Sequence, residues 1–286
     1  MRHLYECPLR WADLDQLGHI NNVVYVDYLQ EARVDMLLTH APDRRSDDLA
    51  DGAVVVRHDV EYAAPLTLRP APVKIETWVT EIRAASFTMA YEIFDETPEG
   101  RVVYLQATTV LTPYVFKTER PRRITPDERD SLLRFLNPVE RVRPEKPAPA
   151  RPAPHRHYPV QVRFSDVDVY GHVNNVKYFE YFQEARISYL SRLAESAGGL
   201  DDASVVIAHT EVDYKIPILF RPEPYDAWTW VSRVGNSSFV LESEIRDGDT
   251  VLSRCRVAVV TFDPETQRSR APSAAYREML LGELEG

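Results

Sequence analysis

The feature that most constrains the fold of this 286-residue chain is an internal repeat. The segment from Arg10 to Arg33 returns 153 positions later as Arg163 to Arg186, and 14 of its 24 positions are identical. A repeat this long indicates a duplicated domain, since the repeats of solenoid proteins are only about 20–50 residues long. The correspondence then continues with a shift of one residue, through Tyr62, Pro65, Arg69, Pro70, Trp78, Ser86 and Phe87, which recur as Tyr214, Pro217, Arg221, Pro222, Trp230, Ser238 and Phe239.

We predict a first domain over residues 1–137 and a second over residues 158–286. The segment 138–157 between them is rich in proline and lacks apolar periodicity, which is typical of an extended linker. In a polyproline-like conformation each residue spans ~3 Å, so a linker of this length can cross the surface of one domain.

Each copy shows the same order of elements: a short strand, a turn-rich segment, an amphipathic helix, four strands and a terminal helix. Because no helix separates the four strands, we expect an antiparallel sheet wrapped around the long helix, which is an α+β fold. The helix of the second copy is expected to stop at Gly198–Gly199. The predicted strands are Leu4–Trp11, Val54–Tyr62, Val73–Arg83, Phe87–Asp95 and Val102–Tyr114, then Tyr158–Phe164, Val205–Tyr214, Ala227–Val234, Phe239–Arg246 and Thr250–Phe262; the terminal helices are Ile124–Leu136 and Ser273–Leu284.

The composition excludes several classes of protein. A hydrophobic content of 44% is typical of soluble globular proteins, and no apolar run approaches the ~18–20 residues of a membrane helix. The first residues lack the apolar core of a signal peptide, so we predict a cytoplasmic protein. A formal net charge of −10 argues against nucleic acid or an anionic membrane as a partner. Two cysteines, Cys7 and Cys255, make no disulfide framework and no metal cluster and are interpreted as structural or incidental thiols.

The densest matches between the copies lie in the motif D-x-D-x-x-G-H-x-N-N, which begins at Asp13 and again at Asp166. Its asparagines stand where the long helix begins, and an asparagine oxygen there accepts hydrogen bonds from the first-turn N–H groups. The same helix start suits a developing oxyanion, because it combines unpaired N–H groups with the positive end of the helix dipole. Gly18 and Gly171 let the backbone turn tightly just before it.

A strand, this motif with a tyrosine three residues on, and a helix that ends E-A-R together resemble the hotdog-fold acyl-CoA thioesterases. Among them the chain is similar to the 4-hydroxybenzoyl-CoA thioesterase-like group and to the acyl-ACP thioesterases. The resemblance covers both halves and leaves out the linker. It implies a double hotdog, in which a dimer is fused into one chain and the sites lie between the two copies. By analogy, we also expect such chains to associate into homo-oligomers.

The resemblance implies that Asp15 and Asp168 are the catalytic carboxylates, each acting as a nucleophile or as a general base. The backbone N–H groups around Asn22 and Asn175 would stabilise the oxyanion, by roughly 3–4 kcal/mol. His19 and His172 would orient the carboxylate or bind substrate, or else serve the structure. The substrate would be an acyl-CoA or acyl-ACP thioester, with no metal ion or organic cofactor beyond the CoA of the substrate. The expected substrate-binding residues are Gly18, Gly171, Tyr25, Tyr178, Arg69 and Arg221.

Alternatives stay open at this stage. Asp13 is interpreted as a structural acid paired with Arg10, and its D-x-D spacing also fits a metal site. Glu31 and Glu184, on the helix, are another position for the catalytic acid. At the level of the whole protein, the alternatives are an acyl-CoA-binding protein without turnover and a hydratase or dehydratase. The acyl group, the choice between CoA and carrier protein, and the equality of the two sites are open as well.

Overall fold

The computed structural model of the chain describes all residues except 41–51, 140–146, 197–203, 264, 267 and 286. It divides into two compact units, Met1–Arg143 and Pro144–Gly286. The predicted linker includes residues 140–146, and the predicted helix stop at Gly198–Gly199 falls within 197–203, so both lie at least partly outside the described residues. In the part of the chain that is described, no helix combines the length and the apolar character needed to cross a membrane.

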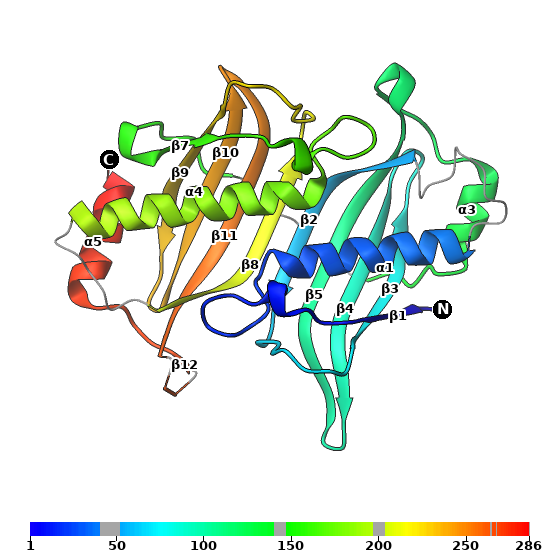
Figure 1. Cartoon of the computed structure of the whole chain (residues 1–286), viewed down its shortest axis with the longest axis horizontal. Helices are drawn as coiled ribbons and strands as arrows, with labels where there is room; N and C mark the ends of the chain where they lie inside the picture. Colours follow the sequence, from blue (N-terminus) through cyan, green and yellow to red (C-terminus); the bar gives the residue numbers. More distant parts are fainter. Residues whose placement is uncertain (41–51, 140–146, 197–203, 264, 267, 286) are drawn as a thin grey trace. The chain divides into compact units, whose positions relative to one another are not determined.

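Unit 1 is an antiparallel sheet crossed by one long helix. Its strands lie in the order β1-β3-β4-β5-β2, so consecutive strands β3, β4 and β5 form a meander. The helix α1 lies across these strands (Figure 1). The elements are β1 His3–Cys7, α1 Val24–His40, β2 Ala53–Tyr62, β3 Val73–Ile82, β4 Phe87–Thr97, β5 Gly100–Val115, β6 Arg120–Pro121 and α3 Pro126–Leu133.

Unit 2 repeats this architecture. Its strands lie in the order β7-β9-β10-β11-β8, again antiparallel, and α4 lies across them (Figure 1). The prediction of an α+β fold with two copies of one helix-on-sheet domain is therefore confirmed. The elements are β7 His157–Val160, α4 Asn175–Ser196, β8 Val205–Tyr214, β9 Tyr225–Val234, β10 Ser238–Asp247, β11 Thr250–Asp263, β12 Arg268–Ser269 and α5 Ala274–Glu285.

The core of each unit lies between the long helix and the sheet. In unit 1 the helix buries Val26, Leu29 and Met36, and alternate residues of β5 such as Leu105 and Leu111 are buried as well. Alternation is expected, because successive side chains of a strand point to opposite faces of the sheet. Each such aliphatic side chain contributes about 1.5–3 kcal/mol when it leaves water. This packing fixes the helix, and with it the loop that enters the helix, on the sheet.

The first strand of each unit is shorter than the sequence predicts. The strand expected over Leu4–Trp11 ends at Cys7, and Trp11–Asp13 form a 3-10 helix instead. Pro8 has no N–H to donate to a neighbouring strand. The carboxylate of Asp13 accepts a hydrogen bond from the backbone N–H of Arg10, which is then not available for strand pairing.

The first strand of unit 2 ends early in the same way. The strand expected over Tyr158–Phe164 ends at Val160, and a 3-10 helix follows over Phe164–Asp166. The carboxylate of Asp166 accepts a hydrogen bond from the backbone N–H of Arg163. In both units the acidic motif therefore lies in a hydrogen-bonded loop rather than on a strand.

The two cysteines are both buried free thiols, as expected for structural residues. Burial raises the pKa of the Cys7 thiol to about 11, and it raises the pKa of the Cys255 thiol further. Both side chains are thus held as neutral thiols at neutral pH.

Candidate active site

The first catalytic candidate, Asp15, lies in a tight loop between the 3-10 helix and α1. An antiparallel bridge between Leu14 and Ile20 closes this loop, which we call the acid turn of unit 1 (residues 14–20). One carboxylate oxygen of Asp15, Oδ1, accepts the N–H of Leu17 at 2.8 Å and the N–H of His19 at 3.1 Å. Gly18 has φ +76°, a left-handed conformation that only glycine adopts without strain. The carboxylate therefore organises the turn that carries it.

The acid turn of unit 2 (residues 167–173) is built in the same way. Oδ1 of Asp168 accepts the N–H of Tyr170 at 2.9 Å and the N–H of His172 at 3.3 Å, and Gly171 has φ +84°. In both turns, no described residue donates a hydrogen bond to the second oxygen, Oδ2. Each aspartate thus has one oxygen fixed by the backbone and one that accepts no hydrogen bond from the described part of the chain.

A buried carboxylate two residues earlier fastens the first acid turn to the helix. Asp13 is 4% exposed, and its Oδ2 accepts the hydroxyl of Tyr28 at 2.5 Å and Nε of Arg10 at 3.1 Å. Burial, and then the negative charge of Asp13, raise the pKa of Tyr28, so the phenol keeps its proton and donates it. The backbone oxygen of Asp13 accepts the N–H of Asn21 at 2.8 Å. We call this set, with Arg10, Asp13 and Tyr28, the clamp of unit 1.

The clamp of unit 2 consists of Arg163, Asp166 and Tyr181. Tyr181 donates its hydroxyl to Asp166 at 2.7 Å, and the backbone oxygen of Asp166 accepts the N–H of Asn174 at 2.8 Å. The structural interpretation of Asp13, paired with Arg10, agrees with this geometry. The two tyrosines were missed as site residues, because their spacing placed them on the apolar face of the helix. Their identity at matching positions was the signal that distinguishes them from ordinary core residues.

The first asparagine of each pair caps the helix. Oδ1 of Asn21 accepts the N–H of Val23 at 3.0 Å, and Oδ1 of Asn174 accepts the N–H of Val176 at 3.0 Å. The sequence left either asparagine of the pair as the cap, and these hydrogen bonds assign that role to the first; in unit 2 Asn175 is already the first residue of α4. In unit 1 the N–H of that second residue, Asn22, donates to no acceptor within the described ranges. It is a free donor at the start of α1.

Tyrosines hold the helix start against the neighbouring strand and loop. Tyr62, on β2, donates its hydroxyl to the backbone oxygen of Asn22 at 2.9 Å, and the hydroxyl of Tyr25 accepts the N–H of Leu66 at 3.2 Å. Tyr25 is 3% exposed, so this predicted substrate-binding residue already uses its hydroxyl inside the fold.

The corresponding bonds of unit 2 join Tyr214 to the oxygen of Asn175 at 2.9 Å, and the N–H of Ile218 to the hydroxyl of Tyr178 at 2.9 Å. Tyr178 is therefore engaged inside the fold in the same way as its counterpart. The role of both tyrosines in binding substrate stays a prediction.

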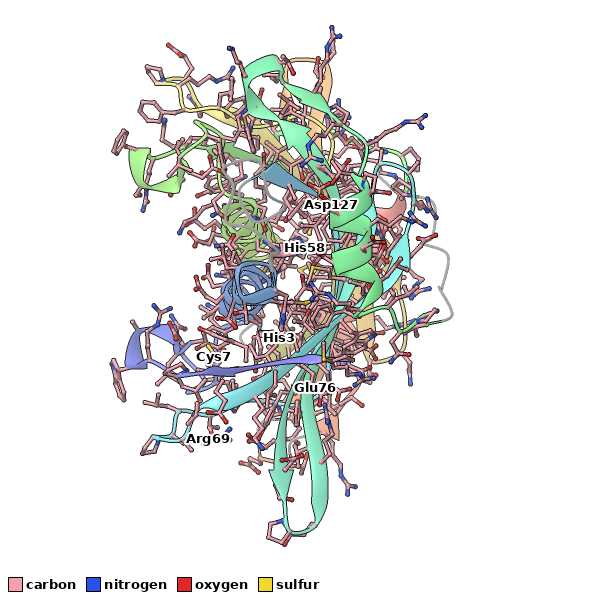
Figure 2. The ribbon with its side chains drawn as sticks, turned by 90° about the vertical axis from the view of Figure 1, so that its right-hand side faces the viewer. His3, Cys7, His58, Arg69, Glu76 and Asp127 are labelled. Carbon is pink, nitrogen blue, oxygen red and sulfur yellow. The ribbon has the colours of Figure 1, made fainter. Side chains whose placement is uncertain are left out.

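The two predicted anion-binding arginines lie beside acidic residues. Arg69 bonds to Asp95 and, at 3.4 Å, to the hydroxyl of Tyr104. Arg221 bonds to Asp247 at 3.0 Å and lies 3.6 Å above the ring centre of Tyr225. Figure 2 labels Arg69, well away from His58. A phosphate at either arginine would share it with a carboxylate, so their role in binding substrate stays a prediction.

The remaining candidates lie in or near the acid turns. His19 and His172 are half-buried, and the backbone of each pairs with the loop beyond it, at Thr67 and Leu219. The helix glutamates Glu31 and Glu184 are exposed, and Glu184 accepts the hydroxyl of Tyr158 at 2.6 Å. An exposed acid on the helix is a weaker candidate for catalysis than the half-buried acid of the turn.

The elements described so far define a class. A long helix across an antiparallel meander, present twice and entered each time through an acid turn, is a tandem hotdog architecture. The family model of the thioesterase-like superfamily matches residues 9–147 and 162–280, which is most of both units. The chain belongs to the thioesterase-like superfamily. This membership supports thioester hydrolysis, in general terms, as its activity.

Known proteins resemble the chain at two levels. The protein YsmA of Bacillus subtilis, itself uncharacterized, is 39% identical over 127 residues, which are 43% of this chain and 82% of the relative. Among solved structures, a putative oleoyl thioesterase from Lactobacillus plantarum has a TM-score of 0.73 at 16% identity, over 92% of this chain and 96% of the other. The 12:0-ACP thioesterase from Umbellularia californica has a TM-score of 0.68 at 17% identity, over 92% and 94%. At these identities the structural likeness shows the fold alone.

Proposed function

We propose that the chain hydrolyses acyl-CoA or acyl carrier protein thioesters, and that Asp15 and Asp168 are its catalytic acids. The products are a carboxylic acid and a thiol. The reaction as proposed uses only the acid turn and the helix start, with no metal ion or organic cofactor. Its substrate is a small-molecule or carrier-bound thioester.

The observation that carries this proposal is that the two carboxylate oxygens of each acid have different hydrogen-bond partners. Two backbone N–H groups hold Oδ1 of Asp15, and Oδ2 has no partner among the described residues. A carboxylate held in this way has a fixed orientation and one oxygen left for chemistry. Asp168 repeats the arrangement with its own turn.

The helix start supplies the second requirement of thioester hydrolysis. Attack on the carbonyl creates an oxyanion, which is stabilised by N–H donors that are already oriented. The unused N–H of Asn22 and the positive end of the α1 dipole are such a donor set, and the clamp holds this helix start to the acid turn. A donor of this kind contributes roughly 3–4 kcal/mol to the transition state.

Two routes fit the same geometry. In the first, Oδ2 removes a proton from water, the hydroxide adds to the carbonyl carbon, and the collapsing intermediate expels the thiolate, which takes up the proton. In the second, Oδ2 itself adds to the carbon and expels the thiolate, and water then cleaves the resulting anhydride. Hydroxylamine traps an anhydride and distinguishes the second route from the first.

The experiment that tests the proposal is thiol release from a panel of acyl-CoA and acyl carrier protein substrates. We expect Asp15→Asn combined with Asp168→Asn to lower kcat by about 10²–10⁴, the usual contribution of a positioned acid or base. Each single variant reports the share of its own unit. Glu31→Gln with Glu184→Gln is the matched control, because these acids are exposed on the helix. Full activity in the aspartate double variant would refute the assignment; binding of acyl-CoA without any turnover by the wild type would show a binding protein instead.

A further inference from the structure

Unit 1 contains a buried arginine that no described residue of the unit neutralises. Arg33 lies on α1 and is 6% exposed, with Nη1 completely enclosed. Across the described residues, no side chain or backbone oxygen forms a hydrogen bond or ion pair with its guanidinium. It belongs to the E-A-R end of the repeated segment and takes no part in the acid turn or the clamp.

A charge in this position is costly. The guanidinium does not lose its proton in proteins, so burial cannot make it neutral. A buried ion without a partner is strongly destabilising, and buried polar groups in native proteins are almost always satisfied. The fold therefore needs a negative group next to Arg33 that the described residues do not supply.

Two further buried polar residues lie side by side on the sheet of unit 1. His58 on β2 and Thr109 on β5 are direct partners across the two strands, and both are completely buried. Both lie on the helix-facing side of the sheet. Val60 and Leu111, two residues further along each strand, are buried on the same side. Figure 2, in which α1 is seen end-on, labels His58 beside this helix.

The charge of Arg33 acts on one of these residues, His58. Burial, and then the positive charge of Arg33, hold the pKa of the His58 imidazole well below its usual range. The imidazole is therefore neutral at neutral pH and has one N–H to donate. Oγ1 of Thr109 is also enclosed and has no hydrogen-bond partner among the described residues.

We propose that Arg33, His58 and Thr109 form a buried binding site in unit 1 for a carboxylate-sized monovalent anion. The guanidinium presents two parallel N–H groups, which match the two oxygens of a carboxylate. The threonine hydroxyl supplies a further donor from the sheet side, and the neutral imidazole lines the site without adding a charge. The anion would neutralise the buried charge of Arg33, and the apolar surroundings would exclude water.

Unit 2 offers an internal control. Arg186 occupies the matching helix position and is 9% exposed. The strand pair that matches His58 and Thr109 is Thr210 and Val257. Unit 2 keeps the arginine, and its Thr210 hydroxyl is also enclosed without a partner among the described residues, but it lacks the imidazole and has the apolar Val257 at the position of Thr109. The combination of the three residues therefore belongs to unit 1.

The anion has two possible sources with the same chemistry. It is either a free anion from solution or the far carboxylate of a dicarboxylic acyl group; the second source rests on the proposed function. Arg33 follows the first residue of α1, Val24, by nine positions, which is about 14 Å along a helix. An acyl group bound at the helix start would have to run along α1 to reach it.

The first test is thermal unfolding of the full chain against acetate and chloride at constant ionic strength. We expect a saturable rise in Tm of a few degrees for wild type and for Arg186→Met, and none for Arg33→Met. General salt effects act on all three proteins alike and cancel in the comparison. Thr109→Val should weaken the response, and Arg33→Lys should keep part of it if Arg33→Met does not fold. Equal responses in wild type, Arg33→Met and Thr109→Val would overturn the proposal.

The second test identifies the source. The ratio of kcat/KM for a dicarboxylic acyl-CoA to that for the monocarboxylic acyl-CoA of equal length is measured in wild type, Arg33→Met and Arg186→Met. A drop of about tenfold in Arg33→Met alone identifies the carboxylate of the substrate. An unchanged ratio together with a positive anion titration identifies a free anion. If no thioester is hydrolysed at all, the proposed function fails, whereas the anion titration still decides the site.

Discussion

The two units agree closely at the acid turn and differ where the first strand meets the end of the long helix. In unit 1 this place holds a chain of side-chain hydrogen bonds, in which His3 lies between Asp35, at 2.8 Å, and His40, at 3.1 Å. Arg134 donates to the backbone oxygen of His40 at 2.8 Å. The side chains are half-buried and partly reached by water.

In unit 2 the residue at the position of His3 is Arg156, and it is buried. It pairs with Glu283 of α5 at 2.9 Å, and the same carboxylate accepts the hydroxyl of Tyr189 at 2.8 Å and binds His155 at 3.1 Å. The contact between the first strand and the end of the long helix is thus made by an ion-pair network in unit 2 and by hydrogen-bonded histidines in unit 1. The difference teaches that the site and its clamp tolerate less change than the supports around them.

The largest effect expected from this comparison is on Arg156→Met. Removing Arg156 takes its buried cationic partner from Glu283, which keeps only its bonds to Tyr189 and His155, and should cost unit 2 about 3–5 kcal/mol. The matching change in unit 1, His3→Gln, should cost only about 1 kcal/mol, because it replaces one hydrogen-bonding group by another. Hydrogen exchange read by mass spectrometry separates the two units; equal loss of protection in both would remove the distinction.

The clamps should respond alike. Tyr28→Phe and Tyr181→Phe each remove a hydrogen bond to a buried carboxylate, which is expected to cost about 1.5–3 kcal/mol in the unit concerned. Because the clamp positions the acid turn, kcat should fall more than KM rises. Tyr158→Phe, which removes the hydroxyl bound to the exposed Glu184, is the control and should leave kcat unchanged. A clamp variant that loses stability with normal kcat would show that the clamp is structural only.

Glu242 and Arg256 pair on the face of the sheet away from α4, and they should give unit 2 a pH-dependent stability that unit 1 lacks. Burial raises the pKa of Glu242 to about 7, against the lowering effect of Arg256 across the strand pair. The folded state therefore holds a proton that the unfolded chain releases near pH 4.5, so this group makes stability fall as the pH rises from about 4.5 to 7. Glu242→Gln should remove this slope, an effect of about 2 kcal/mol between pH 5 and 8. Unit 1 has Ala90 and Thr108 at the matching positions and should show no such slope; a slope that survives Glu242→Gln would contradict the assignment.

The smallest effect belongs to the turn glycines. Gly18→Ala and Gly171→Ala should each cost about 1–2 kcal/mol, because a left-handed residue with a Cβ is strained. A built Cβ meets no atom within 4 Å at either position, so the cost is conformational rather than steric. Gly282→Ala, at a helix position with φ outside the left-handed region, is the control and should be neutral or stabilising. Differential scanning calorimetry would measure both; a large loss at Gly18 alone would show that the two turns are not equivalent.

Much of the fold was predictable, because its local signals agree with one another. Alternation placed the strands, the i, i+3/i+4 spacing placed both long helices, and duplication showed that each signal occurs twice. What was missed depends on contacts between elements that are distant in sequence. The roles of Tyr28 and Arg33 require the helix to be placed on the sheet, and the pairing of Glu242 with Arg256 requires the strand register. The early end of the first strand was visible in Pro8, and the pairing of Asp13 with Arg10 was predicted, but not that the backbone N–H of Arg10 donates to this carboxylate.

The hydrogen bonds at the acid turn have a consequence for isotope chemistry. In free aspartate the two carboxylate oxygens exchange roles by rotation, but in Asp15 two backbone bonds distinguish one from the other. If the acid acts as a nucleophile and water attacks the carboxyl carbon of Asp15 in the anhydride, turnover in H₂¹⁸O should place label at the reacting oxygen and not at the oxygen held by the turn; attack on the acyl carbon would instead place the label in the product acid. The protein would then carry a record of its mechanism at a single, predetermined atom.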